Sequence, residues 1–263
     1  MRADGLGCEA GVPLLDRGEI GLKAQLEERH WWYRGRRRIV LDAVERLHPR
    51  LPADPSVLDV GCGSGAMLAD LSGTVGSATG VDVNPRAVEH ARSRGLGSVF
   101  VAGVEQLPFP GGAFDLVTCL DVLEHVRDDR GALAELRRVT APHGLLLVTV
   151  PAYPSLWSGH DVAAGHVRRY RAGELGAAAE SEGWRPLLET HFNALLLPLV
   201  ICARMIARAR RAPPRSNLLV TPRWIDPVLE VPMQLEAAVI RRGRTLPAGL
   251  SLLAAFENAG ADG

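Results

Sequence analysis

A glycine-rich turn in residues 57–65 (VLDVGCGSG) is the segment whose composition and spacing point most directly to ligand binding. Its apolar start predicts a buried strand, and Gly61, Gly63 and Gly65 follow, with Cys62 between the first two. Glycine permits positive φ and lets backbone amides approach a ligand closely. In a doubly wound α/β sheet, nucleotide-like ligands bind at the turn between the first strand and its helix. The sequence therefore predicts a nucleotide-like cofactor held by these four residues.

Two carboxylates near this turn bear on which cofactor it holds. With Ala66 the turn satisfies the dinucleotide pattern G-x-G-x-x-G/A, which alone would admit a nicotinamide. Asp59, however, precedes the glycines, where its charge would oppose a pyrophosphate but could receive the ammonium group of S-adenosylmethionine. Asp82 ends the second predicted strand and can accept both ribose hydroxyls of either cofactor. Because Lys23 is the only lysine, the Tyr-x-x-x-Lys pair of short-chain dehydrogenases is absent, and S-adenosylmethionine is favoured.

Four segments in order, VLDVGCGSG, VDVNP, QLPFPGGAFDLVTCLDVLEHV and HGLLLVTVP, resemble the successive motifs of class I S-adenosylmethionine-dependent methyltransferases of the type 11 branch. The resemblance covers about residues 57–151. It implies that Asp59 and the three glycines surround the methionine part of the cofactor. It also implies that Asp82 binds the ribose, with Val83 beside the adenine. A nicotinamide oxidoreductase and a non-catalytic cofactor-binding protein on the same fold are the alternatives.

The adenine end departs from the family pattern. Many relatives carry an Asp before the LPF motif, where it receives the adenine amino group, and the equivalent residue here is Gly103. We therefore expect the adenine contact to come from the backbone of Val104 or from Glu105.

An aromatic and basic cluster, HWWYRGRR, occupies residues 30–37 and resembles the N-terminal signature of a bacterial subgroup of this family. Two Trp and a Tyr beside several Arg could form a lid over the cofactor, since Arg suits a bidentate carboxylate contact. We expect Tyr33 and Arg37 near the cofactor's carboxylate, with a break between two helices near Gly35. The alternative is an amphipathic helix whose Trp residues pack on the sheet while its Arg residues are solvated.

The loop after the fifth predicted strand concentrates groups that could move a proton. Histidine titrates near neutral pH, so His160 and His166 are the candidate general bases, with Asp161 or Tyr170 orienting them. We count Tyr170 with the two histidines as a candidate catalytic residue, and a pair of arginines in the loop would suit an anionic substrate. The alternative is that one histidine caps a helix and the arginines form surface ion pairs.

A third group, Asp121, Glu124 and His125, would share one face of a helical turn, because residues i, i+3 and i+4 are neighbours. In ubiquinone-biosynthesis O-methyltransferases, similar acid-x-x-Glu-His sequences hold a divalent cation, although the first acid here is Asp. We expect no metal but a hydrogen-bonded turn that lines the pocket, with Asp121 or Leu120 touching the cofactor.

Short apolar runs alternate with helical patterns, which predicts a Rossmann-like, doubly wound, mostly parallel α/β sheet with N-terminal helices and a helical insertion before the last strand. Strands are expected at 57–60, 78–81, 99–102, 114–120, 145–150, 187–191 and 250–256. Residues 1–18 are expected to be a loose leader, and 19–263 a single domain. Its parts would be a helical lid (19–52), a cofactor core (56–151), a substrate loop and sheet (152–192), a helical cap (193–247), and the last strand with a tail (248–263).

Composition narrows the partners and the location. The 263 residues carry 30 basic and 30 acidic side chains, which gives no general attraction to nucleic acid. Four cysteines without a CxxC pair suggest neither a disulfide framework nor a zinc site, and they fit the cytoplasm. No run reaches the length of a membrane span. We therefore expect methyl transfer to an oxygen, or else a nitrogen or carbon, of a small molecule that is anionic, sugar-like or lipid-linked. The helices of 193–247 would cap the pocket or form a homodimer face, with peripheral membrane contact as the alternative.

Overall fold

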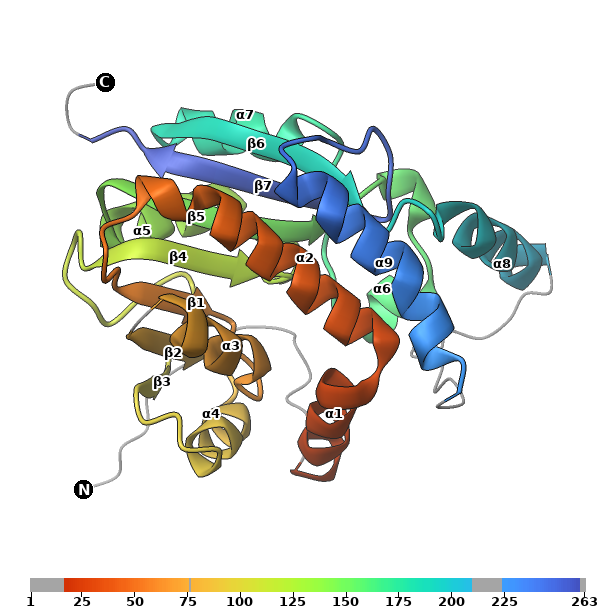
Figure 1. Ribbon diagram of the computed structural model, residues 1–263, viewed down its shortest axis with the longest axis horizontal. Coiled ribbons are helices and arrows are strands. Elements are labelled where there is room, and N and C mark those ends of the chain that lie inside the picture. The colour runs from red at the N-terminus through yellow and green to blue at the C-terminus, as the bar shows by residue number, and fades with distance from the viewer. Residues whose placement is uncertain (1–16, 76, 210–223, 261–263) are drawn as a thin grey trace.

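The computed structural model describes residues 17–75, 77–209 and 224–260 (Figure 1). Most of the predicted leader therefore lies outside the described residues.

A seven-stranded sheet in the order β3-β2-β1-β4-β5-β7-β6 forms the centre of the molecule (Figure 1). Neighbouring strands from β3 to β5 run parallel, and β7 is antiparallel to both β5 and β6. The order reverses between β1 and β4, which confirms the predicted Rossmann-like sheet and places a topological switch point beside the glycine turn. The strands are β1 (Val57–Val60), β2 (Ala78–Asp82), β3 (Val99–Val101), β4 (Phe114–Leu120), β5 (Thr140–Pro151), β6 (Trp184–Phe192) and β7 (Ser251–Asn258).

Helices cover both faces of the sheet, and the central strands are therefore buried along most of their length. Helices α2 and α9 pack together on one face with α3, and α5 and α7 pack on the other (Figure 1). The α-helices are α1 (Arg17–Arg29), α2 (Trp31–Leu47), α3 (Ala66–Val75), α4 (Pro85–Ser93), α5 (Asp129–Val139), α6 (Gly159–Ala163), α7 (Glu174–Ser181), α8 (Leu197–Ala209) and α9 (Asp226–Arg241). Within the described residues, single 3₁₀ turns also form at η1 (His48–Arg50), η2 (Leu123–His125) and η3 (Pro154–Leu156).

The N-terminal helices meet at His30 rather than near Gly35, so the predicted position of the break is wrong. The Nδ1 atom of His30 accepts a hydrogen bond from the backbone N–H of Trp32 and thereby caps α2. Gly35 lies buried inside α2, where an added Cβ would come within 2.6 Å of the Met233 side chain of α9. A glycine at position 35 therefore allows the close approach of α2 and α9, and it does not form a turn.

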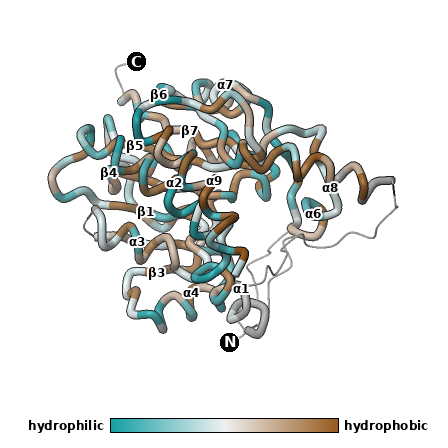
Figure 2. Tube along the Cα trace, turned by 45° about the vertical axis from the view of Figure 1, so that its right-hand side comes forward, coloured by the Kyte–Doolittle hydropathy of each residue, from teal (hydrophilic) through white to brown (hydrophobic). Residues whose placement is uncertain are grey.

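The helical insertion before β7 divides into two unlike parts. Helix α9 buries Met233, Ala237 and Ile240 in the hydrophobic core that α2 and this face of the sheet form. Helix α8 instead projects from the body beyond α9 in both views (Figures 1 and 2), with Leu199 and Met205 among its exposed apolar side chains. Across the described ranges, no helix is both long and apolar enough to span a bilayer. Whether the insertion caps a substrate pocket or forms a dimer face stays a prediction.

Candidate active site

The glycine turn joins β1 to α3 at the carboxyl edge of the sheet, with positive φ at all three predicted glycines. The backbone N–H groups of Gly61 and Cys62 both donate to the carbonyl oxygen of Val81 on β2. An added Cβ on Gly61 would lie 2.3 Å from the Val122 side chain, so a larger residue would clash as well as strain the backbone. The buried Cys62 thiol has a pKa raised above its ordinary value, chiefly by burial. The turn is thus preformed, and Cys62 supports it as a neutral side chain.

Asp59 on β1 is the most unusual side chain beside this turn, because it is only 2% exposed. Its Oδ1 atom accepts a hydrogen bond of 2.7 Å from the Thr118 hydroxyl. Its Oδ2 atom is buried and has no hydrogen-bond partner within the described chain. Burial raises the pKa of Asp59 to about 7, although Thr118 and Arg36 oppose that shift. A buried carboxylate oxygen without a donor is costly, and a ligand cation or N–H group would satisfy it.

Asp82 closes β2 and organises the start of the cofactor loop. One of its carboxylate oxygens accepts from the backbone N–H of Gly63 and the other from that of Asn84, each at 2.8 Å. The following residue, Val83, is a half-exposed apolar side chain at the same edge. This arrangement suits a sugar at the carboxylate and an apolar ring beside Val83.

The departure at Gly103 has a structural counterpart. A Cβ built on Gly103 would lie 2.6 Å from Oε2 of Glu105, so the Glu105 carboxylate occupies the space where a side chain at 103 would extend. Val104 between them is buried. The Glu105 carboxylate therefore lies beside the backbone of Gly103, and its contact with an adenine stays a prediction.

Arg36, the neighbour of the predicted Arg37, contacts the polar side chains at this edge of the sheet. Arg36 forms an ion pair of 3.0 Å with Asp121 at the end of β4 and donates to the Thr149 hydroxyl of β5. The Nε atom of Arg37 lies 2.9 Å from Asp70 of α3, and its Nη1 atom donates to the backbone carbonyl oxygen of Glu27. Tyr33 lies near the same charges, and burial, with the nearby Glu27 carboxylate, raises its pKa to about 12.

Glu27 of α1 was not identified from the sequence, since nothing in its helical context distinguishes it. Its carboxylate accepts a hydrogen bond from the Ser64 hydroxyl in the glycine turn, and its Oε1 atom faces Gly63. Asp59, Asp82 and Asp121 lie around the same edge. Four carboxylates therefore lie around the turn, and Arg36 pairs with one of them, Asp121. This concentration of acidic groups favours a cationic ligand over a pyrophosphate.

The loop after β5 is held by Asp161 of α6, which is fully buried. Its Oδ1 atom accepts from Nε of Arg169 at 2.6 Å and lies 3.1 Å from Nδ1 of His166, and its Oδ2 atom accepts from Ser158. Burial raises the pKa of the Asp161 carboxyl, but the hydrogen bonds from His166 and Arg169 outweigh it and hold the pKa well below its usual range. Asp161 is therefore a charged residue that orients His166.

The remaining candidates of this loop divide by location. The ring of His160 lies 6.2 Å from that of His166, so the two histidines do come together. Tyr170 is almost fully buried, and its hydroxyl donates to Asp129 of α5 at 2.9 Å. Burial, with Asp129, raises the pKa of the Tyr170 phenol far above its ordinary value. The predicted pair of arginines also has structural partners: Arg169 with Asp161, and Arg168 with Asp129 at 2.5 Å.

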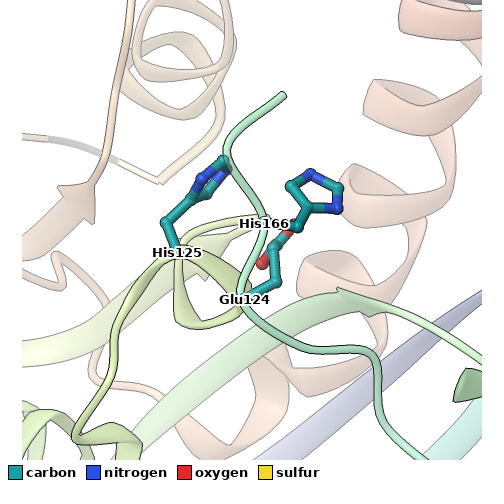
Figure 3. Close-up of side chains that lie close together, drawn as sticks. All are labelled: Glu124, His125 and His166. Carbon is teal, nitrogen blue, oxygen red and sulfur yellow. The ribbon is translucent and has the colours of Figure 1, made fainter. Parts of the chain in front are cut away.

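Figure 3 shows Glu124 and His125 of η2 next to His166, which comes from a separate segment of the chain that passes beside this turn. The rings of His125 and His166 are 4.9 Å apart and nearly perpendicular. Burial raises the pKa of Glu124 well above its ordinary value, and the charge of Asp121 adds to that. Asp121 itself is held by Arg36 and Thr149 and is not part of this group.

Comparison with known proteins identifies a methyltransferase domain in this chain. Residues 58–148 match the model of a methyltransferase domain family. The chain is 35% identical over 154 residues to a probable S-adenosylmethionine-dependent methyltransferase of Mycobacterium tuberculosis, covering 57% of this chain and 54% of that one. Residues 58–148 of this chain therefore form a methyltransferase domain, and the chain is similar to S-adenosylmethionine-dependent methyltransferases. A ubiquinone biosynthesis O-methyltransferase of Xanthomonas oryzae is 35% identical over 124 residues, or 44% of this chain and 52% of that one.

Solved structures agree on the fold of this chain. A chain from the complex between the Haloferax volcanii Trm112 methyltransferase activator and a methyltransferase superposes with a TM-score of 0.60 at 20% identity, covering 93% of this chain and 96% of that chain. The chain spans about half the length of the curated relatives it matches. Members of the family bind S-adenosylmethionine, and the unpartnered Oδ2 atom of Asp59 beside the glycine turn fits that cofactor's ammonium group.

Proposed function

We propose that this chain transfers the methyl group of S-adenosylmethionine to an oxygen atom of a small molecule, with nitrogen or carbon as the alternative acceptor atoms. The single observation that carries the proposal is the buried, unpartnered Oδ2 atom of Asp59 beside the glycine turn. A cofactor ammonium group would supply the missing donor there. A pyrophosphate at the same place would meet a row of carboxylates instead.

The chain's own residues would hold the cofactor from three sides. Asp59 would receive the ammonium group, and Asp82 would accept the ribose hydroxyls, whereas Val83, Val104 and Glu105 would contact the adenine. Arg36 would bind the cofactor's carboxylate, because its guanidinium faces this edge of the sheet. Tyr33 would line the same end of the cofactor site. Arg37 would support that end through its ion pair with Asp70 of α3.

The bound cofactor supplies an electrophilic methyl group on sulfur, so the protein has to orient the acceptor and remove its proton. His160 and His166 are the groups of the loop that could take this proton, and Asp161 orients His166. A base-rich loop favours a hydroxyl acceptor over a carbon. The relative named as a ubiquinone biosynthesis O-methyltransferase supports the same choice.

The acceptor would be an anionic, sugar-like or lipid-linked small molecule. The exposed apolar side chains of α8 and α9, among them Leu199, Ile206 and Val228, favour the lipid-linked class. The same side chains would also serve a homodimer face or a peripheral membrane contact.

Methyl transfer is tested with methyl-labelled S-adenosylmethionine and fractionated bacterial extracts that contain phenols, hydroxy acids, sugars or polyprenyl-linked molecules. The wild-type chain should label one fraction and release S-adenosylhomocysteine. A His160→Ala/His166→Ala double variant should lose at least about 100-fold in turnover, the scale of general-base catalysis. It should still bind S-adenosylhomocysteine as tightly as the wild type. Unchanged labelling by the double variant would contradict the assignment of the base.

A further inference from the structure

Three side chains outside the cofactor contacts form a group with metal-ligand chemistry: Glu124, His125 and His166. Each offers one ligand atom, and these atoms lie within 4.8 Å of one another. Two come from the turn after β4 and one from the loop after α6, so about 40 residues separate them along the chain (Figure 3). The backbone N–H of Val167 donates to the carbonyl oxygen of Glu124 at 2.7 Å and holds the two segments in place.

Hydrogen bonds fix both histidines in the tautomer that a metal ion needs. Nδ1 of His125 lies 3.3 Å from the carbonyl oxygen of Gly165, which can only accept, so Nδ1 carries the proton and Nε2 carries the lone pair. Nδ1 of His166 lies 3.1 Å from the charged carboxylate of Asp161, which imposes the same tautomer. A ligating histidine whose other N–H is held by a carboxylate or a carbonyl is the usual arrangement around protein-bound metals.

The third member of the group is a carboxylate that lacks a donor. Glu124 is 1% exposed, and its Oε2 atom has no hydrogen-bond partner among residues 17–75, 77–209 and 224–260. A buried, unsatisfied carboxylate oxygen is rare because it loses its hydration without compensation. A cation between Glu124 and the two imidazoles would supply that compensation.

We propose that Glu124, His125 and His166 bind one divalent transition-metal ion. Two nitrogen donors and one carboxylate favour an ion such as Zn²⁺ over Mg²⁺, which prefers oxygen ligands. Zn–N and Zn–O bonds of about 2.0–2.1 Å set tetrahedral ligand atoms about 3.4 Å apart, so each pair of ligand atoms would close by no more than roughly 1.4 Å on binding. Three protein ligands leave a coordination position for another molecule.

This ligand set differs from the one that the sequence spacing suggested. Both carboxylate oxygens of Asp121 are engaged, one by Thr149 and the other by Arg36, on the cofactor side of the turn. His166 takes the third place from a distant segment. The expectation that no metal binds concerned Asp121, Glu124 and His125. It does not concern the group of Glu124, His125 and His166.

The role of the ion rests on the proposed function, although its binding does not. An acceptor that ligates the ion through its hydroxyl oxygen would have a lower hydroxyl pKa. That proton would pass to His160, whose ring lies 6.2 Å from that of His166. The acceptor oxygen would then form its bond to the methyl carbon while the carbon–sulfur bond breaks and its electron pair returns to sulfur. In this division of roles His166 is a ligand and His160 is the base.

The test is a titration of the metal-free full chain with Zn²⁺ at pH 7.5 by isothermal calorimetry, with Co²⁺ absorption spectra as a second signature. We expect one ion per chain with a Kd of about 1 μM or tighter. His166→Ala and, independently, His125→Ala should each weaken binding at least about 100-fold, since each removes a ligand. His143→Ala is the matched control, because that exposed histidine lies at the opposite end of β5. Asp121→Asn should also have a smaller effect than His166→Ala: the factor by which it raises the Kd for Zn²⁺ should be at least about ten times smaller.

Binding of S-adenosylhomocysteine, measured on the same samples, separates this inference from the proposed function and shows that each variant is folded. If the wild type binds S-adenosylhomocysteine but takes up no Zn²⁺, the metal site alone is overturned. The same holds if the His166→Ala variant binds Zn²⁺ as tightly as the wild type does. A chain that binds Zn²⁺ but not S-adenosylhomocysteine keeps the metal site and overturns the proposed cofactor.

Discussion

Asp59 provides a prediction whose size follows from its burial. Its pKa is raised from 3.8 to about 7, chiefly because the carboxyl group is buried. The ammonium group of the cofactor needs the charged carboxylate, so a protonated Asp59 must release its proton on binding. The affinity for S-adenosylhomocysteine should therefore fall by up to about tenfold per pH unit below pH 7 and level off above about pH 8.

Calorimetric titration from pH 5.5 to 8.5 in two buffers of different ionisation enthalpy measures both the affinity and the released proton. Asp59→Asn keeps an oxygen that can accept from Thr118 but carries no charge. This variant should bind more weakly above pH 8, and the pH dependence assigned to Asp59 should disappear. An affinity that does not change with pH in the wild type, or an equal slope in Asp59→Asn, would refute this account of the site.

The raised pKa of Asp59 also makes the stability of the ligand-free protein depend on pH. Because the folded-state pKa of Asp59 exceeds its ordinary value, the folded chain binds this proton more tightly than the unfolded chain. The contribution of Asp59 to the free energy of unfolding should therefore be fully present below about pH 4 and be lost as the pH rises to about 7. A rise of about 3 pH units corresponds to roughly 4 kcal/mol. Urea unfolding of the wild type and Asp59→Asn as a function of pH measures the difference.

Three further predictions concern the placement of single residues. Arg36→Ala should lower the affinity for S-adenosylhomocysteine by about 10- to 100-fold, the size of a charge-assisted hydrogen bond, and Arg37→Ala by less than about threefold, in the same calorimetric assay; the reverse order would restore the prediction made from the sequence. Gly35→Ala should destabilise the chain by about 1–3 kcal/mol in urea unfolding, because the new Cβ would meet a side chain of α9 at 2.6 Å. Gly21→Ala, with no atom within 4 Å, should be neutral or stabilising by up to about 1 kcal/mol. Tyr170→Phe should cost about 1 kcal/mol of stability and leave turnover within about twofold, since its hydroxyl is bonded to α5; a loss of 100-fold or more would place the phenol in the chemistry.

The elements that the sequence predicted well are those that local patterns control. The apolar strand before the glycine turn and the positive φ of Gly61 both follow from neighbouring residues. Asp59 and Asp82 follow from their positions at strand ends, because parallel strands bring their carboxyl ends to one edge.

The choice between Arg36 and Arg37 could not be made in that way. Successive residues on an α-helix point about 100° apart, so an uncertainty of one residue decides which side chain faces the sheet edge. The helix begins at Trp31, and the packing of Gly35 on α9 fixes its rotation. That contact joins segments almost two hundred residues apart, and spacing within the motif carries no information about it.

The group of Glu124, His125 and His166 was missed for a related reason. The motif spacing placed Asp121 with the first two, but an ion pair with Arg36 turns that carboxylate away. His166 arrives through the hydrogen-bonded loop around Asp161, whose geometry depends on tertiary contacts.

The most direct test of the central claim is thermal unfolding of the wild type and Asp82→Ala with S-adenosylhomocysteine, with NADH and NADPH in parallel. A ligand at about a hundred times its Kd adds roughly 2.7 kcal/mol, which for a chain of this size raises the Tm by about 5–10 °C. We predict that rise with S-adenosylhomocysteine alone, and its loss in Asp82→Ala. No rise with S-adenosylhomocysteine, or a rise with a nicotinamide instead, would contradict the assignment of this site to S-adenosylmethionine.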